Sequence, residues 1–461
     1  MTKKIDLTQG NIALELTKVS VPIMLTMLIQ MGYNLTDMIW IGSIGSGAVA
    51  AVGTAGFFLW LGNAIMFTPK IGVEVCVAQS IGKRDDKGLL LYINNGILLA
   101  ITLSLIYSIV IFLLAPRLMT FFQLGENVNN YNPTLNAIYY LRIVSTGMIF
   151  TFLNPTYSAI FNGMGNSKLP FYYNTVGLLL NVILDPLLIF GVWIFPELGV
   201  KGAGIATVIS QLIVSTLFLF TINKSFAILQ NNKKVFTLSK EYLLKIIKIG
   251  LPPSLQSGLF AIIAIILARI IVKWGPIPIA VQRIGSQIES LSWMTASGFS
   301  TALSAFVGQN FGACQYKRIL QGYKTAIYIM GTIGVFVSLI LIFFPEPLFK
   351  IFVRESEAVK EGVIYLVILG YSQLFMCLEI TTAGAFNGLG KSVPPSLVGI
   401  TFNALRIPSA LILSYLIGLK GIWWSISGSS IFKGTLLVVW FLIYYKKQFS
   451  SKIIGECPEI S

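Results

Sequence analysis

A carboxylate stands inside a strongly apolar stretch near the start of the chain. Asp37 is flanked by apolar sequence over 19–29 and 38–44, with no other charge nearby. A run of about 20 apolar residues can cross a bilayer as a helix, where an ionised Asp costs about 2.5–3.5 kcal/mol. A cation, a proton or a water-filled cavity must therefore offset the charge. Helical spacing (i, i+4, i+7) places Gln30 and Asn34 on the same face, so we predict that they support Asp37.

A second acidic residue lies within another apolar segment, directly before a proline. Asn181 and Asp185 are four residues apart and share a helix face. Because Pro186 has no N–H to donate, the carbonyl of Val182 is free for another partner. Carboxylate, amide and carbonyl oxygens are the ligands of hard cations, and the same set can hold a proton. The structural alternative is that Asp185 pairs with a base such as Arg142, but for a membrane aspartate we favour a functional role.

Three more polar residues inside apolar segments are candidates for contact with a substrate. Glu289 can pair with the nearby Arg283 or face a cavity, and the sequence favours neither. Glu379 has no basic neighbour in the sequence and is the strongest acidic candidate in the second half of the chain. We add Asn154 as a third candidate.

The composition is that of a membrane protein. The 461 residues are 55% hydrophobic and only 11% charged, with a mean hydropathy of +0.79, whereas soluble domains carry about 25% charged residues. The net charge of +15 is spread over short polar gaps between apolar runs, which is typical of membrane topology and not of nucleic-acid binding. The chain has no His, and its four Cys are widely scattered, so His chemistry is excluded and no metal or disulfide framework is predicted.

The apolar segments predict an all-α membrane protein with twelve transmembrane helices. Lys and Arg are concentrated in alternate gaps, which predicts that both termini are cytoplasmic. The expected helices occupy roughly 17–44, 47–80, 89–115, 134–160, 169–193, 199–222, 246–273, 277–308, 319–345, 361–385, 393–417 and 421–445.

The two halves of the chain repeat each other. We predict a six-helix bundle over 1–222, a basic cytoplasmic linker over 223–245, a second bundle over 246–446 and a cytoplasmic tail over 447–461. Six helices per half give both halves the same orientation, and parallel repeats of this kind belong to alternating-access transporters with a central substrate cavity. The matching strings are Leu16–Pro22 with Ile246–Pro252, Val77–Gly82 with Val307–Gly312, Phe161–Gly165 with Phe386–Gly390, and Gly199–Gly202 with Gly418–Gly421.

The acidic residues do not follow this repeat. Leu267 stands at the counterpart of Asp37, while Arg406 and Ala410 replace Asn181 and Asp185. We therefore predict that a coupling-cation site is confined to the N-terminal half.

The chain resembles the multidrug and toxic compound extrusion (MATE) family of transporters, in its bacterial and archaeal branch. The resemblance covers nearly the whole chain. It is carried by Asp6–Ile12, Tyr33–Trp40, Ala50–Gly53, Leu180–Pro186, Gly202–Thr207 and Val307–Gly312.

The resemblance implies two pseudo-symmetric six-helix bundles around a central cavity and export of small organic cations in exchange for H⁺ or Na⁺. It implies a coupling site at Asp37, Asn181, Asp185 and Thr207, with Na⁺ or a proton bound by the first three. We further expect a monomer in the cell membrane that needs no cofactor and has no enzymatic activity. Other branches of the family place acidic residues in the seventh and tenth helices, and here only Glu379 fits, so we expect a substrate counter-charge there.

Two alternatives remain open at this point. A lipid-linked saccharide flippase of the same superfamily would line its cavity with basic residues for a pyrophosphate, and Arg142, Arg269, Arg283 and Arg406 are available. An intramembrane aspartyl enzyme would use Asp37 and Asp185, although neither lies in a Gly-rich turn.

Overall fold

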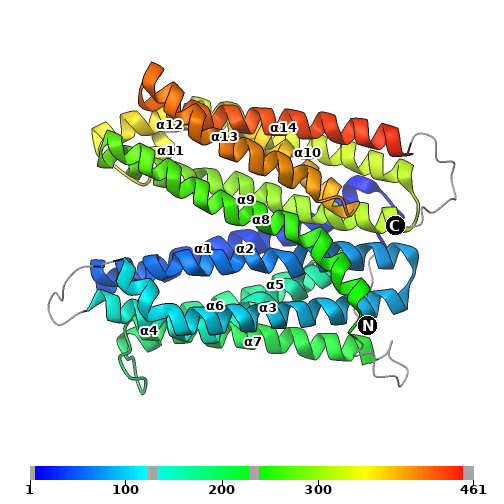
Figure 1. Cartoon of the computed structure of the whole chain (residues 1–461), viewed down its shortest axis with the longest axis horizontal. Coiled ribbons are helices and arrows are strands. Elements are labelled where there is room, and N and C mark those ends of the chain that lie inside the picture. The colour runs from blue at the N-terminus through cyan, green and yellow to red at the C-terminus, as the bar shows by residue number, and fades with distance from the viewer. Residues whose placement is uncertain (1–5, 123, 125–131, 228–237, 450–461) are drawn as a thin grey trace. The chain divides into compact units, whose positions relative to one another are not determined.

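The computed structural model describes residues 6–122, 124, 132–227 and 238–449, and the regular secondary structure of this part of the chain is all helical (Figure 1). The first half contains α1 (Ile12–Ile44), α2 (Ser46–Lys83), α3 (Asp86–Phe121), α4 (Pro133–Thr146), α5 (Met148–Gly163), α6 (Lys168–Phe190) and α7 (Val200–Ala227). The second contains α8 (Lys240–Ile271), a 3₁₀ turn (Val272–Trp274), α9 (Pro276–Gly312), α10 (Tyr316–Phe343), α11 (Pro345–Lys350), α12 (Ser356–Gly388), α13 (Val393–Ile417) and α14 (Leu419–Phe449).

Ten helices of the described chain are long and apolar enough to cross a membrane. The two other expected spans are also present. The span expected at 134–160 is divided into α4 and α5 around Gly147, and the span at 277–308 is the 37-residue helix α9, which carries Arg283 and Glu289 and is less apolar. With these two, the described residues contain all twelve predicted helices, which the fold comparison below confirms.

The described chain divides into two compact units. The first consists of Leu25–Val77 and Asp85–Ser254, and the second of Asp6–Met24, Ala78–Arg84 and the chain from Leu255 onward. Within each unit the helices lie roughly side by side (Figure 1). The bundle boundaries at 222, 223–245 and 446 stay a prediction.

Backbones approach closely inside the second unit at the repeated Gly-rich strings. A Cβ added to Gly82 would meet the backbone carbonyl oxygen of Gln309 at 1.9 Å, and one added to Gly312 would meet that of Gln79 at 2.1 Å. The contact is reciprocal, as expected for two copies of one motif that pack against each other. Small residues permit this close packing of membrane helices.

In the first unit, α6 packs against α7, and α4 packs against α7 as well. Gly177 on α6 is opposite Val214, and Gly202 at the start of α7 is opposite the backbone of Leu188, where an added Cβ would lie 2.3 Å from the carbonyl oxygen. These two glycines bring α6 and α7 together at one point before Asn181 and at another after Asp185. The middle of α6, which carries Asn181 and Asp185, is therefore held in a fixed position inside the unit.

Candidate ion-binding site

Two carboxyl groups from different helices meet inside the first unit. Asp37 on α1 and Asp185 on α6 face each other within hydrogen-bond reach. Asp185 and Asn181 are completely buried, and the Asn181 amide Nδ2 donates to Asp185 Oδ1 over 3.2 Å. The structure thus brings together the three residues that sequence analysis proposed as the core of a coupling site.

The three side chains leave oxygens without partners. Asp37 Oδ1, Asn181 Oδ1 and Asp185 Oδ2 are buried and accept no hydrogen bond. Buried polar atoms are normally satisfied, so three orphaned acceptors in one place indicate an absent positive partner. Two facing carboxylates also repel each other in a medium of low dielectric, and a bound cation or proton stabilises the pair.

The donor set suits a proton or a small hard cation better than a transition metal. Within the described residues, no group of three or more His, Cys, Asp or Glu side chains could hold a metal ion. Two carboxylates and one amide provide only oxygen, which hard cations prefer. The residues at hand therefore fit H⁺ or Na⁺.

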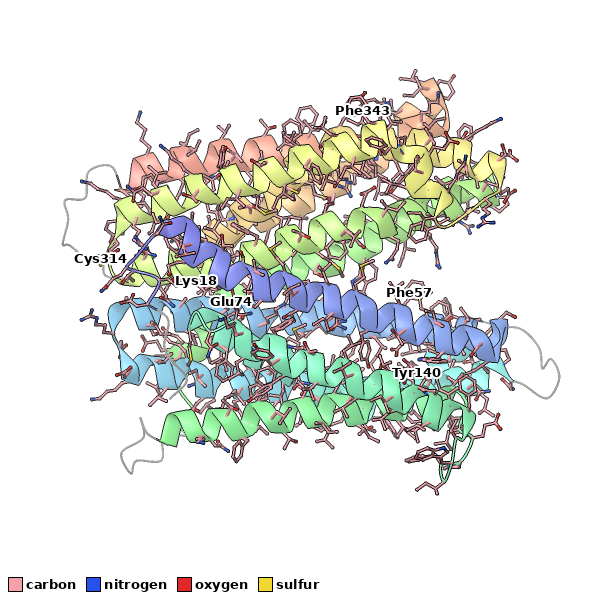
Figure 2. The ribbon with its side chains drawn as sticks, turned by 180° about the vertical axis from the view of Figure 1, so that it is seen from behind. Lys18, Phe57, Glu74, Tyr140, Cys314 and Phe343 are labelled. Carbon is pink, nitrogen blue, oxygen red and sulfur yellow. The ribbon has the colours of Figure 1, made fainter. Side chains whose placement is uncertain are left out.

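Two tyrosines that sequence analysis did not identify complete the surroundings of the pair. Tyr33 on α1 and Tyr140 on α4 are both buried and lie within electrostatic range of Asp37 and Asp185; Tyr140 is labelled in Figure 2. Tyr33 precedes Asp37 by four residues, so the two share a helix face, and this spacing alone could have identified Tyr33. Tyr140 has no such signal, because only tertiary packing brings α4 to this place.

Thr207, which the family resemblance included in the site, lies on α7. Its hydroxyl is adjacent to that of Tyr33 and donates to the Ala203 carbonyl over 3.0 Å. Thr207 is therefore a neighbour of Tyr33, and Tyr33 in turn lies within electrostatic range of the aspartate pair.

For the remaining polar candidates of the first half, the structure gives no contact with the aspartate pair. Gln30 is exposed, and the side chain of Asn34 lies outside the described part of the chain. Asn154 on α5 is buried and donates through Nδ2 to Gln211, at 2.9 Å to its backbone oxygen and 2.7 Å to its side-chain oxygen. Arg142, the base considered as a partner for Asp185, lies over the ring of Phe112 at 5.2 Å.

The acidic residues of the second unit have partners of a different kind. Glu379 on α12 forms an ion pair with Lys433 on α14, at 3.1 Å between Oε2 and Nζ. Glu289 on α9 lies beside the Tyr365 hydroxyl and the Gln373 amide of α12. Unlike the aspartate pair of the first unit, these acids are accompanied by protein cations.

Comparison with known proteins identifies the family and the fold. The sequence model of the MatE family matches residues 22–187 and 249–412, one segment in each half of the chain. A relative named probable multidrug resistance protein NorM, from Thermotoga maritima, is 27% identical over 93% of this chain and 92% of its own length. A relative named FAD transporter, from Shewanella oneidensis, is 22% identical over 92% of each chain. A crystal structure of MATE in complex with MaL6 matches the fold with a TM-score of 0.87 at 22% identity, over 97% of this chain and 99% of that one.

The family model and the named relatives define the class of this protein, a membrane transporter. The chain belongs to the MatE family. It is accordingly a multi-pass membrane transporter and not an enzyme. The match to the solved MATE structure confirms the predicted fold class.

Proposed function

We propose that this chain is a secondary-active antiporter that exports small organic cations in exchange for H⁺ or Na⁺. The proposal is supported above all by the facing carboxyl groups of Asp37 and Asp185 with their orphaned oxygens. The names of the relatives, probable multidrug resistance proteins among them, favour this function over a lipid-linked saccharide flippase. A monomer with both termini in the cytoplasm is part of the same proposal.

The coupling ion acts on the position of α1 relative to α6. When the site is empty, repulsion between Asp37 and Asp185 disfavours the arrangement in which the two carboxyl groups face each other. A proton or Na⁺ removes that repulsion and stabilises the facing arrangement. An ion can shift a conformational equilibrium only by its difference in affinity for the two states, and a carboxylate pair that is closed in one state and separated in the other provides such a difference.

The substrate is proposed to contact acidic and polar groups outside this ion site. Glu289, Glu379 and Asn154 are the candidates that the sequence indicated. Because Glu379 is paired with Lys433, a cationic substrate would have to compete with that lysine. Glu289 retains a buried oxygen, Oε1, without a partner, and is the better acceptor for a positive group.

The test is uptake of a fluorescent organic cation into inside-out vesicles. A Na⁺ gradient at fixed pH, or a pH gradient without Na⁺, should drive uptake by the wild type. Asp37→Asn and Asp185→Asn should each abolish the driven uptake while leaving membrane insertion intact, because each keeps the side-chain volume and removes the charge that the ion neutralises.

A matched control is available outside the site. Glu346 on α11 is 56% exposed and pairs with Lys350 at 2.5 Å, so Glu346→Gln removes one carboxylate without touching the aspartate pair and should transport normally. Normal driven uptake by Asp37→Asn or Asp185→Asn would overturn the mechanism.

A further inference from the structure

The connection between α6 and α7 differs from its counterpart in the second half of the chain. Residues 191–199 link α6 to α7, whereas Gly418 alone links α13 to α14. Because the repeated strings on both sides of these connections match, the first half carries extra chain at this point. α6 is long and apolar enough to cross the membrane, so a loop at its end lies at the boundary between lipid and water.

The loop is fixed to the end of α6 by backbone hydrogen bonds. Gly191 has a left-handed φ of 68°, and the Val192 N–H donates to the Leu187 carbonyl at 3.2 Å, which is the Schellman ending of a helix. At the far end of the loop, the Leu198 N–H donates to the Leu188 carbonyl at 3.1 Å. Both ends of the loop are therefore attached to the last turn of α6, and a folded backbone presents the tip.

Trp193 and Ile194 are the two central residues of the turn at this tip. The Phe195 N–H donates to the Val192 carbonyl at 3.4 Å and closes the turn. Trp193 has a φ of 64°, in the left-handed region that glycine adopts readily and bulky side chains rarely do. The turn itself would be better served by glycine, so the contacts of the indole, and not the backbone, account for a tryptophan here.

The side chains at the tip are apolar and are left uncovered by the described residues. Trp193 is 91% exposed and Ile194 is 90% exposed, and Phe190 and Val192 beside them are each 39% exposed. Residues 186–196 contain no charged side chain. Apolar surface of this extent is unfavourable in water, so a nonpolar environment outside the chain must receive it.

The direction of the loop and the residue types indicate which environment that is. Within the first unit, the loop between α6 and α7 leaves the helix ends sideways, across the helix axes (Figure 1). A loop in this direction lies along the membrane surface. Tryptophan and tyrosine are enriched at that surface, because their rings are apolar and carry one polar group. The same chemistry recurs on the last turn of α13, where Tyr415 is 90% exposed and Leu416 is 66% exposed.

We propose that the loop over 191–199 is a lipid anchor, whose Trp193 and Ile194 side chains insert into the interfacial region of the bilayer. The indole lies at the level of the headgroups, where its N–H donates to a phospholipid oxygen. Ile194 lies against the upper part of the acyl chains. Because α6 also carries Asp185, the anchor fixes one end of the helix that contributes to the candidate ion site.

The test is quenching of tryptophan fluorescence in the full-length protein, reconstituted into phosphatidylcholine nanodiscs. The emission of Trp193 is the difference between the wild type and Trp193→Phe. Phospholipid brominated on the acyl chain near the headgroup should quench this emission strongly, and phospholipid brominated near the terminal methyl group should quench it less. Trp423→Phe is the matched control, because Trp423 is fully buried in the second unit and the emission it removes should respond to neither lipid.

A second variant reports on Ile194. Ile194→Cys is labelled with a nitrobenzoxadiazole dye, and wild type treated in the same way gives the background of the native cysteines. The dye should be protected from iodide in the aqueous phase. Lys87→Cys, at an exposed position of the charged stretch that begins α3, should be quenched by iodide. A thermal melt of each variant identifies loss of folding, and Trp193→Phe keeps an aromatic ring at the tip.

Two outcomes would overturn the lipid anchor. Emission of Trp193 at the wavelength of tryptophan in water, with iodide quenching at position 194, would place the tip in solvent. Emission at short wavelength that neither brominated lipid quenches would show that protein covers the tip, either a second copy of this chain or another protein. None of these measurements involves transport, so they leave the proposed antiport to its own test.

Discussion

At the scale of residues, the candidate ion site is the acid–amide cluster of Asp37, Asn181 and Asp185, and its neighbours are the hydroxyl groups of two tyrosines. Tyr33 lies next to Thr207 and within range of Asp37 and Asp185. The phenol places a neutral polar group within electrostatic range of the pair, which distinguishes the first unit from the second, where Lys433 and Arg406 accompany the acids. This difference supports the proposal that the aspartate pair, and not the acids of the second unit, takes up an external cation.

A conservative change at Tyr33 tests this electrostatic interaction. Tyr33→Phe removes the hydroxyl dipole and keeps the ring, so the half-saturating concentration of the coupling ion should rise by about twofold to tenfold, no more than the effect of one neutral hydrogen bond. The measurement is dye uptake as a function of Na⁺ or H⁺ concentration. Tyr157→Phe is the control, because Tyr157 is also buried but packs its ring against Phe218, 5.7 Å between centroids. An ion dependence identical to wild type in Tyr33→Phe would exclude the role.

At the scale of elements, the site depends on how closely α7 approaches α6. Gly202 faces the backbone of Leu188 and Ile189, three to four residues after Asp185. Backbone atoms cannot yield as the end of a flexible side chain can, so any side chain at 202 must displace one helix from the other. The position of Asp185 relative to Asp37 is therefore coupled to a glycine that carries no functional group.

We expect Gly202→Ala to lower stability by about 1–3 kcal/mol, as overpacking of a tight contact does, and to reduce ion-driven uptake in the molecules that fold. Melting temperature in detergent and uptake per inserted protein measure the two effects. Gly56→Ala on α2 is the control, because an added Cβ there has nothing within 4 Å and alanine favours the helix. A Gly202→Ala protein as stable and active as Gly56→Ala would contradict the explanation.

At the scale of the whole molecule, the start of the chain is anchored by residues some 300 positions later. Arg318 on α10 donates to the backbone oxygens of Leu7, Gln9 and Gly10, at 3.3, 2.7 and 3.0 Å, and Leu7 is fully buried. Gln309 Oε1 accepts from the Leu7 N–H at 3.0 Å. The segment before α1 is thereby part of the second unit, although it directly precedes a helix whose later part, from Leu25, belongs to the first.

Loss of this anchor should loosen the segment without unfolding the helices. Arg318→Ala leaves the carbonyl oxygens of Gln9 and Gly10 without their donor, while that of Leu7 keeps the Asn310 Nδ2 donor at 3.2 Å. We expect hydrogen exchange at residues 7–10 to accelerate and stability to fall by about 1–3 kcal/mol. Lys324→Ala on the same helix, at an exposed position, should change neither. Unaltered exchange in Arg318→Ala would show that the burial of Leu7 and its bonds to Gln309 and Asn310 hold the segment without the arginine.

The sequence by itself determined the helices, the class of membrane protein and the membership of Asp37, Asn181 and Asp185 in a candidate site. It could do so because hydropathy follows from composition over some 20 residues, and because an i, i+4 pair such as Asn181 and Asp185 shares a face on any helix. An acidic residue inside an apolar run is conspicuous for the same local reason.

Only the tertiary structure decided which side chains from different helices meet. Tyr140 lies within electrostatic range of the aspartate pair, Lys433 pairs with Glu379, and Ser429 and Ser430 accept hydrogen bonds from Arg406. None of these contacts is local: each depends on the rotation and separation of two packed helices, which glycines such as Gly202 determine through backbone contact. Hydropathy describes how far a helix runs, whereas packing determines which of its faces meets which neighbour.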